Sequence, residues 1–493
     1  MISVNQLIQD MAEPLATDIQ IAAISMDSRT VPTDSLFIAS AKDQSMRQQH
    51  IDQAIAAGAK AIITGTEHSA DVSVPLIKIA GLDQQISAIG DRFYNKPSHS
   101  MTVIAVTGTN GKTSVSQFIA QGLELSGQPC GVIGTLGQGR LSDLQDTGMT
   151  TPNPLQLQQT LAAMRDAGIR YVAIEASSHA LAQGRLNAVA IDIAVLTNLS
   201  RDHLDYHGDM QSYAAAKQRL FMIPTVSTAI VNIDDAFGQA LYKQQQPATL
   251  NWLSYSQQQS ADWQAKNIRF DASGVHFELA SKTASQVINA QLLGRFNIDN
   301  LLATAAVLSA LKIPPKPIAK YLSQLQPVSG RMQLLQQANS PVVVIDYAHT
   351  PDALSHALSA MRQHLDQNAD LWCVFGCGGD RDRGKRPLMG QRAEQLASHL
   401  VLTDDNPRSE ASDSIIAEIS AGMQQPQNAT IITDRRHAIF YAVAEAANDD
   451  MVLVAGKGHE NYQEILGKKQ PFNDATVVQE ALQARQQRSG ANL

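Results

Sequence analysis

The sequence predicts an α/β protein built from three domains. Its 493 residues are about three times the usual domain length. Aliphatic runs of strand length alternate with stretches of helix length along most of the chain, which is typical of parallel sheets covered by helices. Polar segments near Pro97 and Pro327 interrupt this pattern. We therefore expect a small α/β domain at residues 1–98, a central domain with a P-loop-type, mostly parallel sheet at 99–330, and a C-terminal Rossmann-like, doubly wound domain at 331–493.

Composition narrows the class of function. Hydrophobic residues make up 44% of the chain and charged residues 17%, as in an ordinary globular protein. A formal net charge of -8 argues against general nucleic-acid binding, which depends on many Lys and Arg contacts to phosphate. The cysteines Cys130, Cys373 and Cys377 are too few for a disulfide framework and favour a reducing compartment. Because no apolar run has the length of a signal peptide or a membrane span, we expect a cytoplasmic protein with no membrane partner.

The first domain shows a short, mixed pattern. Strands are expected at residues 21–26, 36–40, 61–64 and 76–80, with helical periods at 51–57 and 84–94. Asp27, Ser28 and Arg29 follow the first strand. By itself this tripeptide indicates only a turn with an exposed arginine.

The central domain opens with a phosphate-binding signature. Residues 104–113 read IAVTGTNGKT, in which a β-branched strand at 102–106 ends at Gly108 and a helical pattern resumes after Lys112. Glycines let backbone N–H groups point at a phosphate, the helix N-terminus adds its positive end, and Lys112 adds a mobile cation. The hydroxyl of Thr113 suits Mg²⁺, which prefers hard oxygen ligands. The first glycine of the common P-loop motif is a valine here, but the remaining features, all in register, predict nucleotide binding.

Later strands of the central domain end in polar clusters. Strands expected at 171–175, 191–197 and 228–232 alternate with helices, which predicts a mostly parallel sheet with the phosphate loop at the carboxyl end of its first strand. The segments 175–179 (EASSH) and 198–208 (NLSRDHLDYHG) follow two of these strands. Acid, imidazole and hydroxyl groups at this edge are what a metal–phosphate site requires, whereas the alternative is a polar surface loop.

A further polar segment, residues 294–300 (GRFNIDN), leads into an alanine-rich helix expected at 301–311. Alone, its residues Asn297 and Asn300 indicate no more than helix caps. The segment ends the regular part of the central domain, before the Pro327–Gly330 turn.

The C-terminal domain has the most regular alternation. Five expected strands are separated by helical segments, which predicts a doubly wound sheet. These strands lie at residues 342–346, 371–376, 400–403, 430–433 and 451–455. Polar segments follow four of them, at residues 346–351, 376–386, 405–408 and 456–460. The basic residues of the second segment alternate with Asp380 and Asp382, which favours a small anionic ligand over nucleic acid.

Eight motifs occur in a fixed order: GTNGKT, EASSH, NLSRDHLDYHG, GRFNIDN, DYAHTPD, GCGGDRDRGKRP, DNPR and GKGHE. GTNGKT alone is shared with folylpolyglutamate synthetases, but the full set resembles the Mur ligase family over essentially the whole chain. The resemblance is strongest to members that add diaminopimelate. It implies an ATP-dependent ligase that joins meso-2,6-diaminopimelate to UDP-N-acetylmuramoyl-L-alanyl-D-glutamate (UDP-MurNAc-L-Ala-D-Glu) through an acyl phosphate, giving ADP and phosphate. This reaction belongs to cytoplasmic peptidoglycan precursor synthesis, and we expect a monomer that requires ATP and Mg²⁺.

The resemblance assigns nucleotide and metal roles to residues of this chain. ATP is expected on Gly108, Thr109, Asn110, Gly111, Lys112 and Thr113, with Asn297 and Asn300 near adenine and Asp346 and His349 near ribose or phosphate. Magnesium is expected on Thr113, Glu175, His203 and Lys217, the last as a carbamate. Lys112, Lys217 and His203 are the expected catalytic residues. Carbamylation would turn Lys217 into a carboxylate able to bind a second metal ion, whereas the alternative is a helical lysine that faces solvent.

The resemblance also assigns substrate contacts to residues of this chain. The first domain is expected to hold the uridine nucleotide through Ser28. The muramoyl dipeptide is expected on Thr150, Thr151, Ser177, Gln183 and Arg185. Diaminopimelate is expected on Arg381, Asp405, Asn406, Pro407, Arg408, Gly456 and Glu460. Two departures stand out, since Met149 occupies a position where related enzymes often have asparagine, and the loop 41–47 lacks the usual His and Gly.

Three other functions stay open from the sequence. A folylpolyglutamate synthetase would share the phosphate loop and the acyl-phosphate route, but would have no use for DNPR or a uridine domain. A P-loop switch or motor would hydrolyse nucleotide without forming an amide. A lysine-adding ligase is the nearest competitor, and Arg408 argues against it because lysine would present an ammonium group to that arginine.

Overall fold

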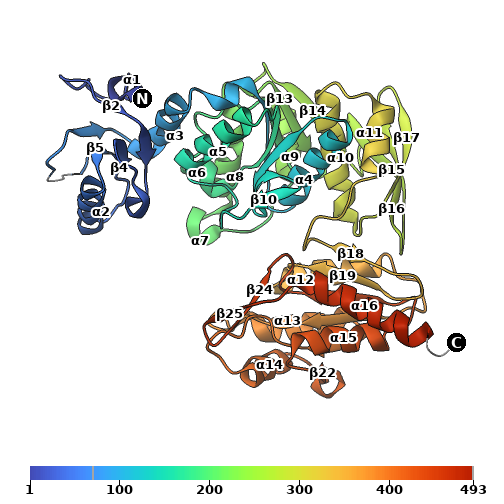
Figure 1. The fold of residues 1–493 in the computed structure, drawn as a ribbon. Coiled ribbons are helices and arrows are strands. Elements are labelled where there is room, and N and C mark those ends of the chain that lie inside the picture. Colours follow the sequence, from blue (N-terminus) through green and yellow to red (C-terminus); the bar gives the residue numbers. More distant parts are fainter. Residues whose placement is uncertain (69–71, 491–493) are drawn as a thin grey trace. The chain divides into compact units, whose positions relative to one another are not determined.

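The computed structural model describes residues 1–68 and 72–490, and the chain divides into two compact units. The first comprises residues 1–255 and 306–311, and the second comprises 256–305 and 312–493. Both consist of sheets with accompanying helices (Figure 1), which confirms the predicted α/β class. The boundaries of the three predicted domains stay a prediction. Among the described helices, none combines the length and apolar character needed to cross a membrane.

A four-stranded parallel sheet forms the N-terminal part of the first unit. Its strands match the expected ones to within a few residues and lie in the order β3 (Ala23–Ser25), β4 (Ser35–Ile38), β5 (Ala59–Gly65) and β6 (Leu76–Ile79). The other elements here are β1 (Ile2–Ser3), β2 (Gln20–Ile21), α1 (Val4–Leu7), α2 (Gln44–Ala56) and α3 (Leu82–Phe93). Helix α2 begins well before the expected residue 51, because the Asp43 side chain caps it by accepting a hydrogen bond from the Met46 N–H.

The central sheet of the first unit carries the phosphate loop. Its order is β10 (Asp143–Gln145), β9 (Gly137–Arg140), β8 (Cys130–Gly134), β11 (Tyr171–Glu175), β7 (Thr102–Thr107), β12 (Ile193–Leu196), β13 (Thr228–Asn232) and β14 (Asn251–Ser256). Strands β8, β11, β7, β12, β13 and β14 are parallel, while β9 and β10 pair antiparallel. The helices are α4 (Lys112–Leu125), α5 (Pro154–Asp166), α6 (Ser178–Ala182), α7 (Leu204–His207), α8 (Met210–Gln218) and α9 (Ala236–Gln244). The mostly parallel sheet is as predicted.

The second unit begins with an antiparallel meander of β15 (Trp263–Asp271), β16 (Gly274–Ser281) and β17 (Ser285–Ala290). Helix α10 (Arg295–Ala310) starts six residues before the expected helix, and α11 (Pro315–Leu322) follows. Asn297 and Asn300 therefore lie inside a helix and are not its caps.

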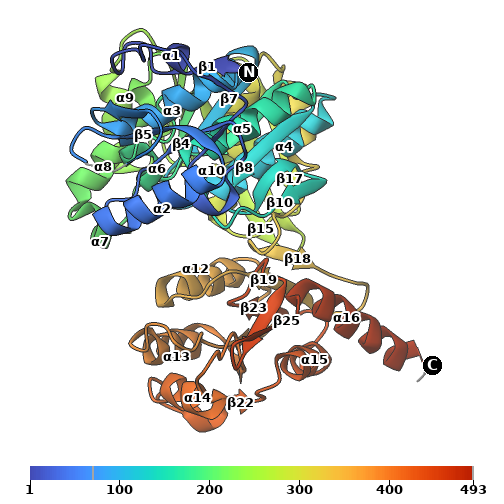
Figure 2. The ribbon, with the colours of Figure 1, turned by 60° about the vertical axis from the view of Figure 1, so that its left-hand side comes forward.

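The C-terminal sheet of the second unit is doubly wound. Its order is β18 (Gln333–Leu335), β19 (Val342–Asp346), β23 (Met451–Ala455), β20 (Leu371–Phe375), β21 (His399–Leu402) and β22 (Thr430–Ile431), and only β18 is antiparallel. One face packs against α12 (Pro351–Arg362), α13 (Lys385–Leu396) and α14 (Ser412–Ser420), and the other against α15 (Arg435–Glu445) and α16 (Asp474–Gly490) (Figure 2). A hairpin of β24 (Tyr462–Ile465) and β25 (Lys468–Pro471), absent from the expected elements, follows β23.

Candidate active site

The phosphate loop lies between β7 and α4, as the sequence predicts. Gly108 has φ +150°, and a Cβ atom on it would stand 1.8 Å from Oγ1 of Thr197, so the site requires glycine. Nζ of Lys112 donates hydrogen bonds to the carbonyl oxygens of Gly108 and Thr109, both at 2.9 Å. Helix α4 begins at Lys112, so the first N–H groups of the helix belong to this loop. The loop therefore has the donors and the cation that a polyphosphate needs.

Glu175 is buried at the end of β11 and bound to two threonines. Oγ1 of Thr113 donates to Glu175 Oε2 at 2.9 Å, and the N–H of Thr135 donates to Oε1 at 2.9 Å. Burial raises the pKa of Glu175, against the opposing charge of Lys112. Carboxylate and hydroxyl oxygens are ligands that Mg²⁺ prefers, so Thr113 and Glu175 fit a magnesium site. Thr135 belongs to no motif and was not found from the sequence.

Lys217 is not the solvent-facing lysine of the alternative interpretation. It is 1% exposed on α8, and its Nζ donates to the carbonyl oxygen of Gly108 at 2.7 Å. The same nitrogen lies 4.4 Å from the ring centroid of Tyr213. Burial, and then the charge of Lys112, lowers the pKa of Lys217 to about 6. A neutral amine is the form that reacts with carbon dioxide to give a carbamate, and near pH 7 this lysine is largely neutral.

His203 belongs to a cluster of rings beside the phosphate loop. Its ring centroid lies 4.9 Å from that of His179 and 6.2 Å from that of Tyr213. Tyr213 OH and Thr109 Oγ1 are 3.1 Å apart, which joins the cluster to the loop. Across residues 1–68 and 72–490, no three His, Cys, Asp or Glu side chains are placed to hold a metal ion by themselves. A magnesium ion here would therefore depend on Thr113 and on phosphate oxygens as well.

The residues expected to hold the dipeptide form one network with Glu175. Oγ1 of Thr151 donates to the Glu175 carbonyl oxygen at 2.6 Å and contacts Oγ of Ser177 at 3.1 Å. Nη1 of Arg185 donates to the Thr151 carbonyl oxygen at 2.6 Å, while Nε and Nη2 both donate to Oε1 of Gln183. Thr150 joins this group through its hydroxyl, 3.0 Å from that of Thr135. Met149 is 46% exposed beside it.

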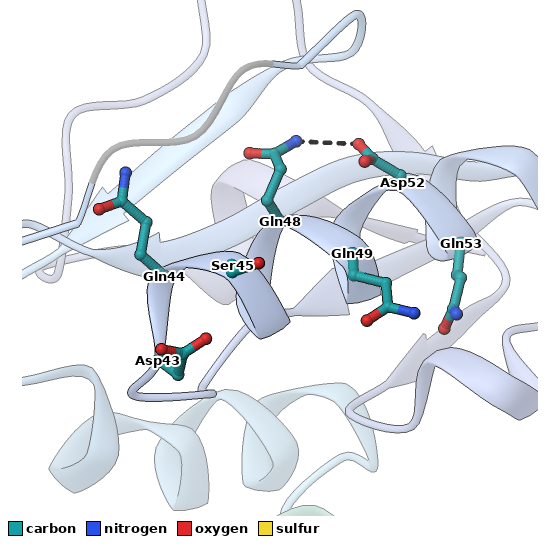
Figure 3. Close-up of a pocket in the computed structure, with 7 residues that line it drawn as sticks. All are labelled: Asp43, Gln44, Ser45, Gln48, Gln49, Asp52 and Gln53. Atoms are coloured by element: carbon teal, nitrogen blue, oxygen red, sulfur yellow. Dashed lines mark hydrogen bonds between the residues drawn. The ribbon is translucent and has the colours of Figure 1, made fainter.

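Ser28 lies next to a polar hollow on α2. Its Oγ donates to Oε1 of Gln53 at 2.7 Å, and Gln53 lines a hollow of about 830 Å³ (Figure 3). The loop expected at 41–47 is shorter than predicted, because its last four residues belong to α2. Arg47 is 2% exposed, and its Nη1 donates to the carbonyl oxygens of Ala41 and Lys42. Arg47 thus fixes the backbone just before the hollow. The lining residues are Asp43, Gln44, Ser45, Gln48, Gln49, Asp52 and Gln53.

In the second unit, the four residues expected near adenine and ribose fall into two pairs. Asn297 and Asn300 are buried, and Nδ2 of Asn300 donates to Oδ1 of Asn297 at 2.9 Å. Asp346 Oδ2 accepts a hydrogen bond from the Met332 N–H at 2.8 Å, and burial raises its pKa. His349 is exposed. No hydrogen bond or ion pair among the described residues joins the two asparagines to Asp346 or His349.

The expected amino-acid site lies at the carboxyl ends of β21 and β23, where Asn406 and Glu460 meet. Nδ2 of Asn406 donates to Glu460 Oε2 at 2.9 Å. Lys457 is fully buried, and its Nζ donates to Asn406 Oδ1 and Glu460 Oε2, both at 3.0 Å. The same nitrogen lies 3.9 Å from Asp405 Oδ1. A Cβ atom on Gly456, whose φ is +115°, would stand 2.6 Å from Asp405 Oδ2. Sequence reasoning missed Lys457, since a lysine between glycines gives no sign of burial.

Arg408 follows Pro407 and is anchored to the β24–β25 hairpin. Its N–H donates to the Glu464 carbonyl oxygen at 3.0 Å, and its own carbonyl oxygen accepts from the Leu466 N–H at 2.7 Å. Nη1 donates to the Gly379 carbonyl oxygen at 2.8 Å, and Nε lies 3.3 Å from Glu464 Oε2. The hairpin therefore sets the position of this arginine.

The Arg408 guanidinium and the Cγ atom of Arg381 both lie near Gly378. A Cβ atom on Gly378 would stand 3.0 Å from Arg408 Nη1 and 3.6 Å from Arg381 Cγ. Both oxygens of Asp380 accept a hydrogen bond from the Ser409 hydroxyl, so the loops that carry the two arginines are joined. The second unit thus places the loops that carry Arg381 and Arg408 next to each other.

Comparison with known proteins identifies relatives along the whole chain. Residues 106–308 match the Mur ligase middle domain, and residues 330–458 match the Mur ligase glutamate ligase domain. A UDP-N-acetylmuramoyl-L-alanyl-D-glutamate–2,6-diaminopimelate ligase of Xanthomonas campestris is 48% identical over 98% of this chain and 98% of its own length. The protein of that name in Pseudomonas aeruginosa is 47% identical over 95% and 96%. A solved structure of an enzyme with the same name is 38% identical and has a TM-score of 0.75 over 98% of this chain and 99% of its own.

Proposed function

Because this chain belongs to the Mur ligase family, we propose that it is an ATP-dependent ligase of peptidoglycan precursor synthesis. It joins meso-2,6-diaminopimelate to UDP-MurNAc-L-Ala-D-Glu. Relatives with 47–48% identity over nearly the full length carry this activity in their names. The observation in the structure that supports the choice of amino acid is the placement of Arg408, which Gly379 and Glu464 hold beside the loop that carries Arg381, since guanidinium groups suit an amino acid with two carboxylates.

The first step joins two anions. Lys112 and the N–H groups of the phosphate loop bind ATP and offset the repulsion between its γ-phosphate and the carboxylate of the UDP-linked dipeptide. That carboxylate attacks the γ-phosphorus, ADP leaves, and an acyl phosphate forms. Thr151, Ser177, Gln183 and Arg185 form one hydrogen-bonded network beside Glu175, which suits them to orient the dipeptide.

Thr113, Glu175, His203 and a carbamylated Lys217 are the residues that would hold Mg²⁺. When bound, the ion neutralises phosphate charge. The 2.9 Å contact between Thr113 and Glu175, and the burial and low pKa of Lys217, support this assignment. Carbamylation also places a negative charge beside Lys112, because both lysines donate to the Gly108 carbonyl oxygen.

In the second step an amine of diaminopimelate attacks the acyl carbon and phosphate leaves. Glu460 is held through Oε2 by Asn406 and Lys457, while its Oε1 accepts no hydrogen bond from a described residue. This oxygen is placed to accept from an ammonium group of the substrate. Arg408 and Arg381 bind the carboxylates, so the reacting amine arrives in a fixed orientation. The buried cysteines form no disulfide, which fits the cytoplasm as the place of the reaction.

The test is to incubate the purified chain with UDP-MurNAc-L-Ala-D-Glu, ATP, Mg²⁺ and a panel of meso-diaminopimelate, lysine, ornithine and glutamate. Mass spectrometry of the product should show the diaminopimelate amide, with one phosphate released per amide. Lys112→Ala serves as the inactive control. Phosphate release without any amide would instead indicate a nucleotide-driven switch, and preferred lysine addition would overturn the assignment of the amino acid.

A further inference from the structure

Arg408 does not stand as an isolated cation in the structure. Its Nε lies 3.3 Å from Glu464 Oε2, and the side chains of the two residues are 18% and 24% exposed. Its Nη1 donates to the carbonyl oxygen of Gly379. Within residues 1–68 and 72–490, no other carboxylate forms an ion pair with Arg408, and no acceptor contacts its Nη2. Nε of the guanidinium thus faces Glu464, and Nη2 is the nitrogen that can bind a ligand.

The backbone and the side chain of Glu464 make different contacts. Its backbone joins the hairpin to the amino-acid site, because its carbonyl oxygen accepts from the Arg408 N–H and its N–H donates to Asn406 Oδ1 at 2.9 Å. Among the described residues, its carboxylate pairs only with Arg408. A change from carboxylate to amide therefore keeps the backbone contacts and removes one negative charge beside Arg408.

We propose that Glu464 is a specificity-determining residue, whose carboxylate competes with the second carboxylate of the amino-acid substrate for Arg408. This inference rests on the proposed function. A dicarboxylic substrate reaching Arg408 meets a neighbouring anion and must share the guanidinium with it. A side chain that ends in an ammonium group, such as that of lysine, meets a carboxylate that can pair with it. Glu464 therefore makes the preference for diaminopimelate over lysine smaller than Arg408 alone would make it.

The other charged groups near Arg408 are already engaged. Asp380 accepts a hydrogen bond from the N–H of Ser409 and another from its hydroxyl, which lies within reach of both carboxylate oxygens. Glu460 is paired with Lys457 at 3.0 Å. Among the described residues, Glu464 is the carboxylate whose only ion pair is with the arginine that the substrate needs, so its removal should change the selectivity of the site and breaks no other ion pair.

The experiment compares Glu464→Gln with the wild-type chain for kcat/KM with meso-diaminopimelate and with lysine. We expect the ratio of kcat/KM for meso-diaminopimelate to kcat/KM for lysine to rise about tenfold. The substitution removes the repulsion between Glu464 and the carboxylate of diaminopimelate, and it also removes the attraction between Glu464 and the ammonium group of lysine. The KM for ATP should not change. Glu445→Gln, at an exposed position at the end of α15, is the matched control and should leave the ratio unchanged. A rise of less than about threefold, or a fall, would overturn the proposal.

Two further measurements separate this inference from the proposed function. In an Arg408→Gln background, Glu464→Gln should no longer alter the ratio, and an undiminished effect there would contradict competition for Arg408. If lysine addition lies below detection, the test is kcat/KM for meso-diaminopimelate alone. This value should be at least about threefold higher in Glu464→Gln than in the wild-type chain. If the wild-type chain adds neither amino acid, the proposed function itself fails, because that result does not depend on Glu464.

Discussion

Replacement of Arg435 by methionine tests how the two loops of the amino-acid site are held. Arg435 is 1% exposed, and its Nε and Nη2 donate to the two carboxylate oxygens of Asp474 at 2.8 and 2.7 Å. Nη2 also donates to the carbonyl oxygen of Ala455, and Nη1 to that of Asp404. These carbonyl groups stand directly before Asp405 and Gly456, so one guanidinium ties together the ends of β21 and β23. Arg435→Met would leave the Asp474 carboxylate buried without a partner.

We expect Arg435→Met to lower the free energy of unfolding of the C-terminal sheet by about 3–5 kcal/mol, as for other buried ion pairs that lose one partner. The double variant Arg435→Met/Asp474→Leu replaces the pair by apolar groups of similar size, and should recover most of this loss. Trp372 of β20 is 8% exposed and reports unfolding of this sheet, once the other two tryptophans, Trp252 and Trp263, are replaced by phenylalanine.

The assay is denaturant unfolding followed by Trp372 fluorescence, together with kcat and KM for meso-diaminopimelate and ATP. The KM for meso-diaminopimelate should rise in both variants, because both lose the contacts to Ala455 and Asp404. A loss below about 1 kcal/mol in Arg435→Met, or a double variant less stable than the single one, would refute the reasoning from burial.

Three other variants test the remaining parts of the site. Lys112→Ala should reduce ligation at least about a hundredfold, since it removes a cation from the phosphoryl transition state, while circular dichroism stays unchanged; near-normal turnover would exclude Lys112 from the mechanism. Lys217→Ala should lose activity that formate or acetate partly restores, and native mass spectrometry in bicarbonate should find one carbon dioxide on the wild-type chain alone. The hydrogen bond from Arg386 lowers the pKa of Glu410 to about 2, so its stabilisation is complete above the ordinary pKa of 4.5 and is lost as the pH falls through about 2. Glu410→Gln should therefore be less stable than wild type at pH 6 and equally stable near pH 2, and a difference independent of pH would contradict this.

The parts of the fold that sequence reasoning predicted well are those determined locally. The phosphate loop is an example, because a strand, a glycine that must adopt φ +150° and a helix starting at Lys112 are all encoded within residues 102–113. The strands expected at 342–346, 371–376, 400–403 and 451–455 were also found, because each is a largely buried aliphatic run. The expected edge strand at 430–433 is only two residues long in the structure, since an edge strand has a single neighbour to pair with.

The parts that were missed depend on contacts between distant segments. Strand β25 reads KKQP and is exposed along its length, so no alternation of apolar and polar residues marks it. Its partner β24 is fixed by the backbone of Arg408, which lies more than fifty residues earlier. Lys457 and Thr135 show the same limit, because their hydrogen bonds to Glu460 and Glu175 form only in the folded chain. The missed residues are those that hold the expected ones in place.

The amino-acid site is built from charges that are already paired. Arg408 is paired with Glu464, and Glu460 with Lys457, before any substrate is bound. Diaminopimelate carries two ammonium and two carboxylate groups, so a carboxylate that binds Arg408 shares it with Glu464, and an ammonium group that binds Glu460 shares it with Lys457. An unpaired buried charge costs several kcal/mol. The binding free energy therefore depends more on where the substrate carries its charged groups than on its net charge. Selectivity should then follow from the positions that the β24–β25 hairpin and Gly378 give to these groups, and a variant that moves Arg408 by altering the hairpin should impair recognition even with every charge retained.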